Sequence, residues 1–369
     1  MLGDLELLLL LTFSEAQPSY IFSWLTSNGY AYKASPKVAE AAKLDEMHGS
    51  REALRALLHD EVSRLKLSLE TFTKKSESLT EIFTITLLTA PVMLYSLGLF
   101  QPWLLPSTTI LLIILNTMII ALYNNLYPKE LRIMKLPRKM AICAAYPLLI
   151  LPVTKLIWPS CAIEILLALL FASSLPPGIA VFVETRRVNR ELRENLELLI
   201  KASSTPFHIF TYLDPNILKR ETKTELSRSV RIATYLMGIW GSEKTGLTEL
   251  RNVYEELLRT LNSIKAKGTF SALSNLVALF LLGFSSSLVT QLISLFKSRE
   301  ILISTGVTIA FGEVKTWMEI YLAYAPLAYA LGLALLSLGS VAFYPMWLPL
   351  SSLTALVGYV AGKNIVVGG

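Results

Sequence analysis

Charged residues are scarce in this sequence. They make up 17% of the 369 residues, whereas hydrophobic residues make up 53%. Soluble domains contain about 25% charged residues. Together with the mean hydropathy of +0.51, this balance excludes an ordinary soluble enzyme and a disordered chain. It indicates that part of the chain lies in lipid.

Cysteine and histidine are almost missing as well. Two cysteines exclude a disulfide framework or a zinc cluster, and three histidines leave little for a metal centre. The motifs H-E-x-x-H, G-x-S-x-G and G-x-x-x-x-G-K-[ST] do not occur. We therefore predict no catalytic residue, no cofactor and no metal site, and we do not expect an enzyme.

Long stretches without charge predict membrane helices. No charged residue occurs between Glu81 and Lys129, a run of 47 residues. A straight helix of that length measures about 70 Å, whereas the hydrocarbon core is roughly 30 Å thick. The run must therefore fold back once, and Gln101-Pro102-Trp103 with Pro106-Ser107 supply the turn. We predict spans near 82–101 and 106–126.

Five further spans follow from the same argument. Apolar stretches near 140–157 and 162–183 are separated by Trp158-Pro159-Ser160, and another runs through 268–296. Tyr344-Pro345 splits the last charge-free run, 320–362, into two spans. The apolar segment Ile301–Phe311 has 11 residues, too few to cross, so it lies in the interface or re-enters the membrane. The predicted fold class is an all-α integral membrane protein with about seven transmembrane helices and two helical cytoplasmic domains.

The distribution of lysine and arginine predicts the orientation. Segments 1–81, 126–139 and 184–268 carry 9, 5 and 15 of the 34 basic residues, and the turns at 101–106 and 158–161 carry none. Basic segments are retained on the cytoplasmic side. We therefore expect a multi-pass protein of the cell membrane with a cytoplasmic N-terminus. With seven spans, the C-terminus lies outside.

Four regions result from these boundaries. Residues 1–81 form a first cytoplasmic helical domain, in which the apolar run Leu7–Leu11, too short to insert, is expected to be a core helix. Residues 82–183 hold four transmembrane helices with a basic cytoplasmic loop at 127–139. Residues 184–268 form the second cytoplasmic domain. Residues 269–369 hold three transmembrane helices with an external loop near 297–319.

Both predicted cytoplasmic domains have helical periodicity. Apolar residues from Leu54 to Phe72, and again from Leu247 to Ile264, recur at steps of three and four, which places them on one face of a helix. In each domain a Gly-Ser pair, Gly49-Ser50 or Gly241-Ser242, precedes the charged helix that leads into a span. This order indicates either a weak internal repeat or simply two helical domains beside a membrane.

Basic clusters and small residues are the candidate functional positions. Two clusters flank the predicted spans and are candidates for facing a protein partner or lipid: Lys129, Arg132, Lys135, Arg138, Lys139, Arg186, Arg187, Arg190 and Arg193. Juxtamembrane cations gain about 1 kcal/mol each from anionic lipid. An acidic partner protein is the other interpretation, and no nucleic acid is expected.

Three other features mark the predicted spans. Gly358 and Gly362 form a G-x-x-x-G pattern, which lets two helices approach closely, either within the chain or between two copies. Lys155 and Glu164 flank an outer turn, where they could pair. Cys143 and Cys161 lie in or beside apolar runs, where inert packing is the default.

The layout resembles the platform proteins of type II secretion and type IV pilus machines (GspF/TadC-like), in particular the archaeal branch that includes the archaellum platform. The similarity lies in two helical domains that each lead into membrane helices, and it is clearest over Gly49–Phe83 and Glu194–Ile293. Relative to archaeal members, the first domain is expected to be shortened at its N-terminus.

The resemblance implies a function and partners. A hexameric secretion-type ATPase would act on the helical domains from the cytoplasm, and the platform would lift pilin-like subunits out of the bilayer. The family also suggests a homodimer. A multi-pass transporter or channel component is the alternative, and a membrane enzyme acting on lipids is a third interpretation. The scarcity of charge in the spans speaks against transport of polar solutes.

Overall fold

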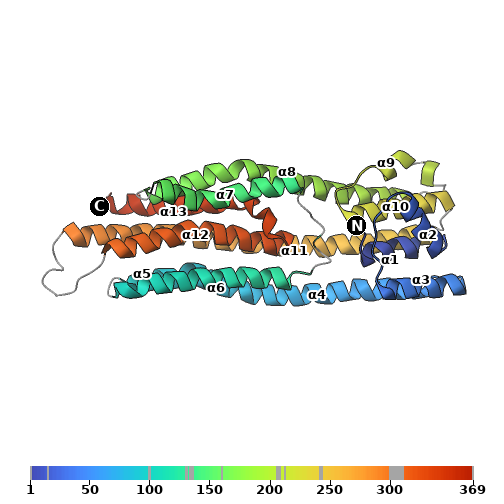
Figure 1. Ribbon diagram of the computed structural model, residues 1–369, viewed down its shortest axis with the longest axis horizontal. Coiled ribbons are helices and arrows are strands. Elements are labelled where there is room, and N and C mark those ends of the chain that lie inside the picture. The colour runs from blue at the N-terminus through green and yellow to red at the C-terminus, as the bar shows by residue number, and fades with distance from the viewer. Residues whose placement is uncertain are drawn as a thin grey trace. The chain divides into compact units, whose positions relative to one another are not determined.

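The chain is almost entirely helical in the computed structural model (Figure 1). The structure describes residues 2–14, 16–98, 101–128, 132, 137–158, 161–204, 209–211, 213–240, 244–298 and 311–367. Within these ranges the only extended pairing is an isolated bridge between Leu2 and Tyr32. The predicted all-α class is therefore confirmed for the described part of the chain.

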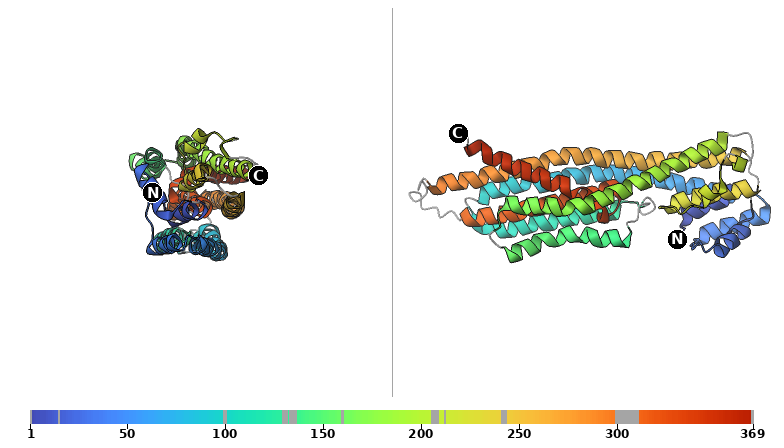
Figure 2. Two further views of the ribbon diagram at one scale, coloured as in Figure 1. Left: turned by 90° about the vertical axis from the view of Figure 1, so that its right-hand side faces the viewer. Right: turned by 90° about the horizontal axis from the view of Figure 1, so that it is seen from above.

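The chain divides into two compact units. Unit 1 comprises residues 1–71, 128–135 and 184–263, and unit 2 comprises 72–127, 136–183 and 264–369. Unit 1 thus holds most of both segments predicted as cytoplasmic domains. Three helices contribute residues to both units without interruption (Figures 1 and 2): α4 (Glu52–Thr84), α8 (Ile163–Ser204) and α11 (Lys244–Ser298).

The core of unit 1 is formed around its first helix. Helix α1 (Asp4–Phe13) is apolar on all sides, and Leu7–Leu11 are completely buried where α1 packs against α10 (Glu225–Trp240). A helix that is hydrophobic all round must be enclosed by other elements. The expectation of a core helix at Leu7–Leu11 is therefore confirmed.

Two short helices and the capping of α4 complete the N-terminal part of unit 1. Helices α2 (Pro18–Ser27) and α3 (Pro36–His48) pack against each other. The buried Asp45 of α3 accepts hydrogen bonds from the backbone N–H groups of Ala53 and Leu54, both at 2.9 Å. A carboxylate at this position satisfies amides that a helix start leaves without partners. Asp45 thereby fixes where α4 begins.

The periodic faces predicted from the sequence are buried. On the unit 1 part of α4, Leu54, Leu58, Val62 and Leu65 are each at most 6% exposed. The apolar face of α11 is buried from Leu247 through Ile264. Ion pairs join the two helices within unit 1, Arg55 to Glu249 at 3.6 Å and Lys66 to Glu256.

Unit 2 contains the apolar helices. These are the ends of α4, α8 and α11 together with α5 (Ala90–Gly98), α6 (Leu105–Leu126), α7 (Arg138–Ile157), α12 (Phe311–Leu338) and α13 (Leu348–Val367). In the described residues five helices are long and apolar enough to cross a membrane: Glu52–Ser96, Leu105–Leu126, Ile163–Ser204, Asn275–Leu292 and Val314–Leu338. The chain therefore has the character of a membrane protein.

Two of the seven predicted spans are not among these five. In the described part of α7 the apolar stretch is Ala145–Thr154, and α13 also falls outside the set. Helix α7 carries prolines at 147 and 152. The seven-span count and the orientation of the termini stay predictions.

One predicted boundary is wrong. Part of the segment predicted as an external loop near 297–319 is helical, because α11 continues to Ser298 and α12 already begins at Phe311. Lys315 and Glu319 lie one turn apart on α12 with 3.8 Å between Nζ and Oε1, so the two charges partner each other at the helix end. The segment Ile301–Phe311 lies outside the described residues except for Phe311.

Helix α12 is the centre of unit 2. It packs against α5, α6, α13 and the 3₁₀ segment η6 (Val341–Met346), and most of its side chains are buried. By contrast, α6 exposes a row of large apolar side chains, among them Ile110, Leu111 and Ile114. An exposed apolar surface of this kind fits contact with lipid rather than water.

A π-helical turn lies at the contact of α12 with its neighbours. The turn η1 (Ile85–Thr89) joins α4 to α5. The hydroxyl group of Tyr321 donates to the carbonyl oxygens of Thr86 and Leu87 at 3.1 and 3.2 Å. Asn116 of α6 donates from Nδ2 to the Tyr321 hydroxyl at 3.0 Å and accepts from Thr86 Oγ1 at 2.8 Å. These bonds join three helices around the π-helical turn.

We expect Asn116→Leu to lower the free energy of unfolding by about 1 kcal/mol, since each interhelical hydrogen bond in a membrane contributes about 0.6 kcal/mol on average. Unfolding in mixed micelles, followed by circular dichroism, measures the change. The control is Ile114→Leu, an exposed apolar position on the same helix. Equal stability of the two variants would contradict the structural role of Asn116.

Candidate functional site

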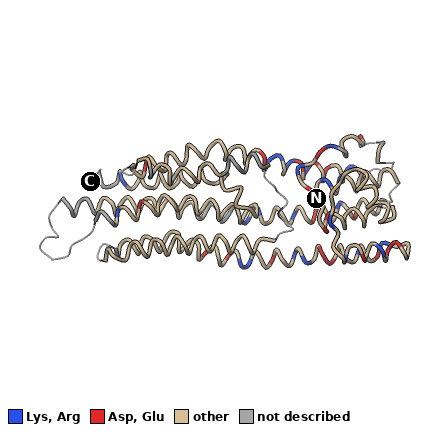
Figure 3. Tube along the Cα trace, in the orientation of Figure 1, with Lys and Arg blue, Asp and Glu red and all other residues tan. Residues whose placement is uncertain are grey.

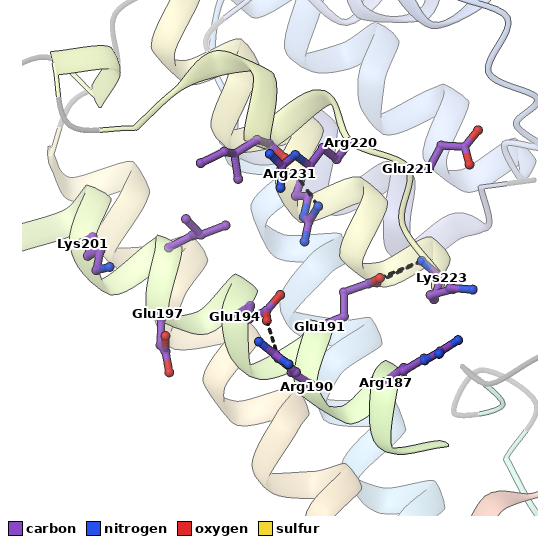
Figure 4. Close-up of a pocket in the computed structure, with 12 residues that line it drawn as sticks. Arg187, Arg190, Glu191, Glu194, Glu197, Lys201, Arg220, Glu221, Lys223 and Arg231 are labelled. Carbon is purple, nitrogen blue, oxygen red and sulfur yellow. Dashed lines mark hydrogen bonds and ion pairs between the residues drawn. The ribbon is translucent and has the colours of Figure 1, made fainter. Parts of the chain in front are cut away.

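Charge gathers in unit 1. Figure 3 shows most lysine, arginine, aspartate and glutamate residues on the segments of unit 1, while the helices of unit 2 carry few. A groove with mixed charge and a volume of about 450 Å³ lies between the unit 1 part of α8, the short helix α9 (Pro215–Lys219) and α10 (Figure 4). We call it the charged groove. Its lining is Arg187, Arg190, Glu191, Glu194, Glu197, Leu198, Lys201, Ile217, Arg220, Glu221, Lys223 and Arg231.

Periodicity along α8 places one wall of the charged groove. Arg187, Arg190, Glu194, Glu197 and Lys201 follow one another at steps of three or four, so they share a helical face. Most of these positions are solvent-exposed, as long charged side chains on a helix surface usually are.

A short segment after α9 forms the other wall and is tied to α8. Lys223 donates from its backbone N–H to both oxygens of Glu191, at 2.9 and 3.1 Å. The Lys223 Nζ also pairs with the nearly buried Glu184 at 3.0 Å, and Arg187 approaches the same carboxylate at 3.7 Å. Arg190 and Glu194 pair along the helix at 2.8 Å. The glutamates therefore neutralise part of the cationic surface and hold the segment in place.

Arg231 lies at the inner end of the charged groove. Its side chain comes from α10 and is only 7% exposed. Its Nε donates to Oδ1 of Asn195 at 2.7 Å, and its Nη1 lies 3.5 Å from the carbonyl oxygen of Ile217. None of the ion pairs found in the described part of the chain involves Arg231. A buried guanidinium that has only neutral acceptors retains attraction for an anion, because burial is costly for an unpaired charge.

A buried tyrosine supports the same region. Tyr254 of α11 donates from its hydroxyl to the carbonyl oxygen of Leu192 at 3.0 Å. Burial raises the pKa of Tyr254 above its ordinary value, so the phenol stays protonated and keeps this bond. This hydrogen bond from α11 therefore holds the backbone of α8 beside the charged groove.

The predicted basic residues fall into three places. Arg187 and Arg190 line the charged groove, while Arg186 and Arg193 are exposed on α8 without lining it. Arg132 is half-buried in the part of unit 1 that covers 128–135. The remaining predicted cations are not described at the side-chain level: Lys129 and Lys135 lie outside the described residues, as do the side chains of Arg138 and Lys139 in the first turn of α7.

Several residues of the charged groove were missed by the sequence interpretation. Arg220, Lys223, Arg231 and the glutamates are separated from Arg187 by 30 residues or more, or carry the opposite charge. The spacing of Arg190 and Glu194, four residues apart, could have predicted that a glutamate neutralises part of this basic surface. Arg231 had no such signal, because the sequence does not show that this residue of the amphipathic helix α10 is buried.

The predicted glycine pair lies in a contact within the chain. A Cβ atom on Gly358 would meet the carbonyl oxygen of Phe280 on α11, and one on Gly362 would lie 2.7 Å from the carbonyl oxygen of Phe284. Gly283 of α11 in turn faces the backbone of Ala355. The two backbones can approach this closely only because side chains are missing on both helices. In this chain the G-x-x-x-G face is thus occupied by α11.

The structure also describes Glu164 and Cys161, which the sequence analysis named beside the predicted spans. Glu164 pairs with Lys363 of α13 at 3.0 Å, and the side chain of Lys155, its predicted partner, lies outside the described residues. Lys363 is available to Glu164 because it lies one residue beyond the glycine pair of α13. Cys161 is buried, and the side chain of Cys143 is not described.

Comparison with known proteins adds no relative. No protein-family model matches the chain, and neither the curated proteins nor the solved structures contain a match. In the described residues, no group of three or more His, Cys, Asp or Glu side chains is placed to hold a metal ion.

We predict that two substitutions at the inner end of the charged groove change the stability of the protein by different amounts. Asn195→Ala leaves the Arg231 charge without its closest acceptor and should cost about 2 kcal/mol of stability. Arg231→Met removes the buried charge but keeps the aliphatic volume, so its stability should stay within about 1 kcal/mol of the unmodified protein. Thermal unfolding in detergent compares them. A larger loss for Arg231→Met than for Asn195→Ala would show that the guanidinium is mainly structural.

At the glycine contact, Gly358→Leu should destabilise the protein by about 1–3 kcal/mol, because the new side chain overpacks against α11. Val357→Leu is the matched control, since Val357 is 50% exposed. Thermal unfolding and size-exclusion chromatography with light scattering separate the two roles of this face. Unchanged stability together with loss of a dimer would assign the glycines to self-association.

Proposed function

We propose that this chain is the inner-membrane platform (assembly) protein of an archaeal type IV pilus-, archaellum- or type II secretion-like machine. In this role it couples a cytoplasmic secretion ATPase to the extrusion of pilin-like subunits. The observation that carries the proposal is the composition of unit 1. Two charged helical segments far apart in the sequence, 1–71 and 184–263, belong to one compact unit, and each continues into an apolar helix of unit 2.

The continuity of three helices supports a mechanical role. Helices α4, α8 and α11 each run as one helix from residues of unit 1 to residues of unit 2, although Pro176 and Pro177 of α8 lack an N–H donor. A helix transmits displacement along its axis better than a flexible loop, because its backbone groups are bonded to one another. Force that a motor applies to unit 1 would reach the apolar helices by this route.

The charged groove and the neighbouring cations are the proposed docking surface for the ATPase. Six basic and four acidic residues line the groove, so it presents a net positive but patterned surface. Patterned charge favours specific and fast association with a complementary partner more than it favours high affinity. Arg186 and Arg193 extend the positive surface along α8.

Charge reversal tests this docking surface. We expect Arg187→Glu, Arg190→Glu and Arg193→Glu together to abolish filament assembly and recovery of the ATPase, while membrane insertion stays intact. The matched control reverses three exposed lysines of unit 1 outside the groove: Lys33, Lys37 and Lys43. Both triple variants are checked for insertion and for helical content. Normal filaments from the arginine variant would contradict the proposed surface.

A pull-down in mild detergent, followed by mass spectrometry, tests the class itself. The platform function requires that a secretion-type ATPase and small pilin-like proteins are recovered with the tagged chain. Recovery of neither from correctly inserted protein would contradict the proposal. Solute flux into liposomes that contain only this protein would then favour the transporter alternative.

A further inference from the structure

A second groove lies in unit 2, between α4 and α11. Its volume is about 670 Å³, in the range of small-molecule sites. Phe72, Thr73 and Ser76 contribute from α4, Ile264 and Gly268 from α11, and Leu336 from α12. All lining residues belong to unit 2. We call it the interfacial groove.

Apolar side chains form the base of the interfacial groove. Phe72, Ile264 and Leu336 line it and are otherwise buried in the unit. A Cβ atom on Gly268 would lie 2.9 Å from Cα of Ser337, so the glycine allows α11 to approach α12 closely beside the groove. The base is thus suited to a hydrocarbon chain.

Charged residues border the same groove. Glu77 of α4 and Lys267 of α11 pair at 3.2 Å, and both side chains are more than half exposed. Glu81 follows Glu77 one turn later and is also exposed. The rim therefore offers two carboxylates and one ammonium group, with one more negative than positive charge.

The position of this rim along the chain is that of a membrane boundary. Glu81 is the last charged residue before the 47-residue charge-free run, and Lys267 is the last before the charge-free run that begins at Gly268. Charged side chains of membrane helices lie at the level of the lipid headgroups. The apolar base and the charged rim are therefore placed where a lipid has its chain and its headgroup.

We propose that the interfacial groove binds a membrane lipid whose headgroup carries both a phosphate and an amine. A hydrocarbon chain occupies the apolar base. The phosphate faces Lys267, and the ammonium group faces Glu81 and Glu77. An anionic headgroup without an amine would instead meet a rim of net negative charge. The assignment is independent of the platform function, because it uses only unit 2 and its boundary with lipid.

Binding of acyl-chain-labelled phosphatidylethanolamine to the delipidated full-length protein in detergent, followed by fluorescence anisotropy, tests the groove. Thr73→Phe fills the interfacial groove and should weaken binding about tenfold, the cost of losing contact with about two methylene groups. Ser78→Phe adds the same side chain to an exposed position of α4 outside the groove and should leave binding unchanged. Equal binding by the two variants would overturn the proposal.

Headgroup preference tests the charged rim. Phosphatidylethanolamine should bind more tightly than phosphatidylglycerol with the same label, and Glu81→Gln should reduce that preference about fivefold, since one charge near a membrane surface contributes about 1 kcal/mol. A preference for phosphatidylglycerol would overturn the headgroup assignment. A bound apolar polypeptide that Thr73→Phe releases and phosphatidylethanolamine does not displace would overturn the lipid assignment itself. Neither outcome depends on recovery of an ATPase or of pilin-like proteins.

Discussion

Unit 2 holds helices long and apolar enough to cross a membrane, and the constraint that accounts for its structure is the lack of water in a hydrocarbon region. A backbone or side-chain polar group without a partner costs several kcal/mol there, so every segment must satisfy its own groups. Helices do this for the backbone. Where the helix deviates, at the π-helical turn Ile85–Thr89, the carbonyl oxygens of Thr86 and Leu87 accept from the hydroxyl of Tyr321. Asn116 completes the bonding, and the result is a defined contact between α6, α12 and the α4–α5 junction.

Close approach of backbones is the second means by which unit 2 is held together. Apolar side chains gain little by leaving lipid for protein, so helix contacts in membranes depend on packing. Gly283, Gly358 and Gly362 remove the side chains that would separate α11 from α13. The charged pair Glu164–Lys363 lies at the far end of α13 from η6. Small residues, this ion pair and interhelical hydrogen bonds such as that from Ser351 Oγ to the carbonyl oxygen of Pro326 therefore fix the position of α13.

Unit 1 has the pattern of a domain in water. Its buried interior is apolar, as the enclosed helix α1 shows, and its surface carries the charge. Most surface ion pairs of this kind contribute at most about 1 kcal/mol to stability. Arg231 is the exception, since it is buried and has only neutral acceptors. A buried charge with only neutral acceptors costs stability, and the groove that holds it is the docking surface that we propose.

The sequence by itself determined the helical class, the apolar stretches and the buried faces of α4 and α11. Each of these follows from local periodicity and from the distribution of charge. Both can be read along the sequence without knowing which residues are neighbours in space. The core role of Leu7–Leu11 followed from its length alone. The start of α12 at Phe311 was missed because Lys315 and Glu319 read as loop charges until their pairing on one helix is known.

Only the tertiary structure decided which segments meet. It brought residues from Arg187 to Arg231 together in the charged groove, paired Lys363 with Glu164, and placed α11 on the glycine face of α13. It also aligned Glu77 with Lys267 across 190 residues of sequence. Such contacts depend on which helix faces which, and helical periodicity specifies the apolar face of a helix but not the neighbour that covers it.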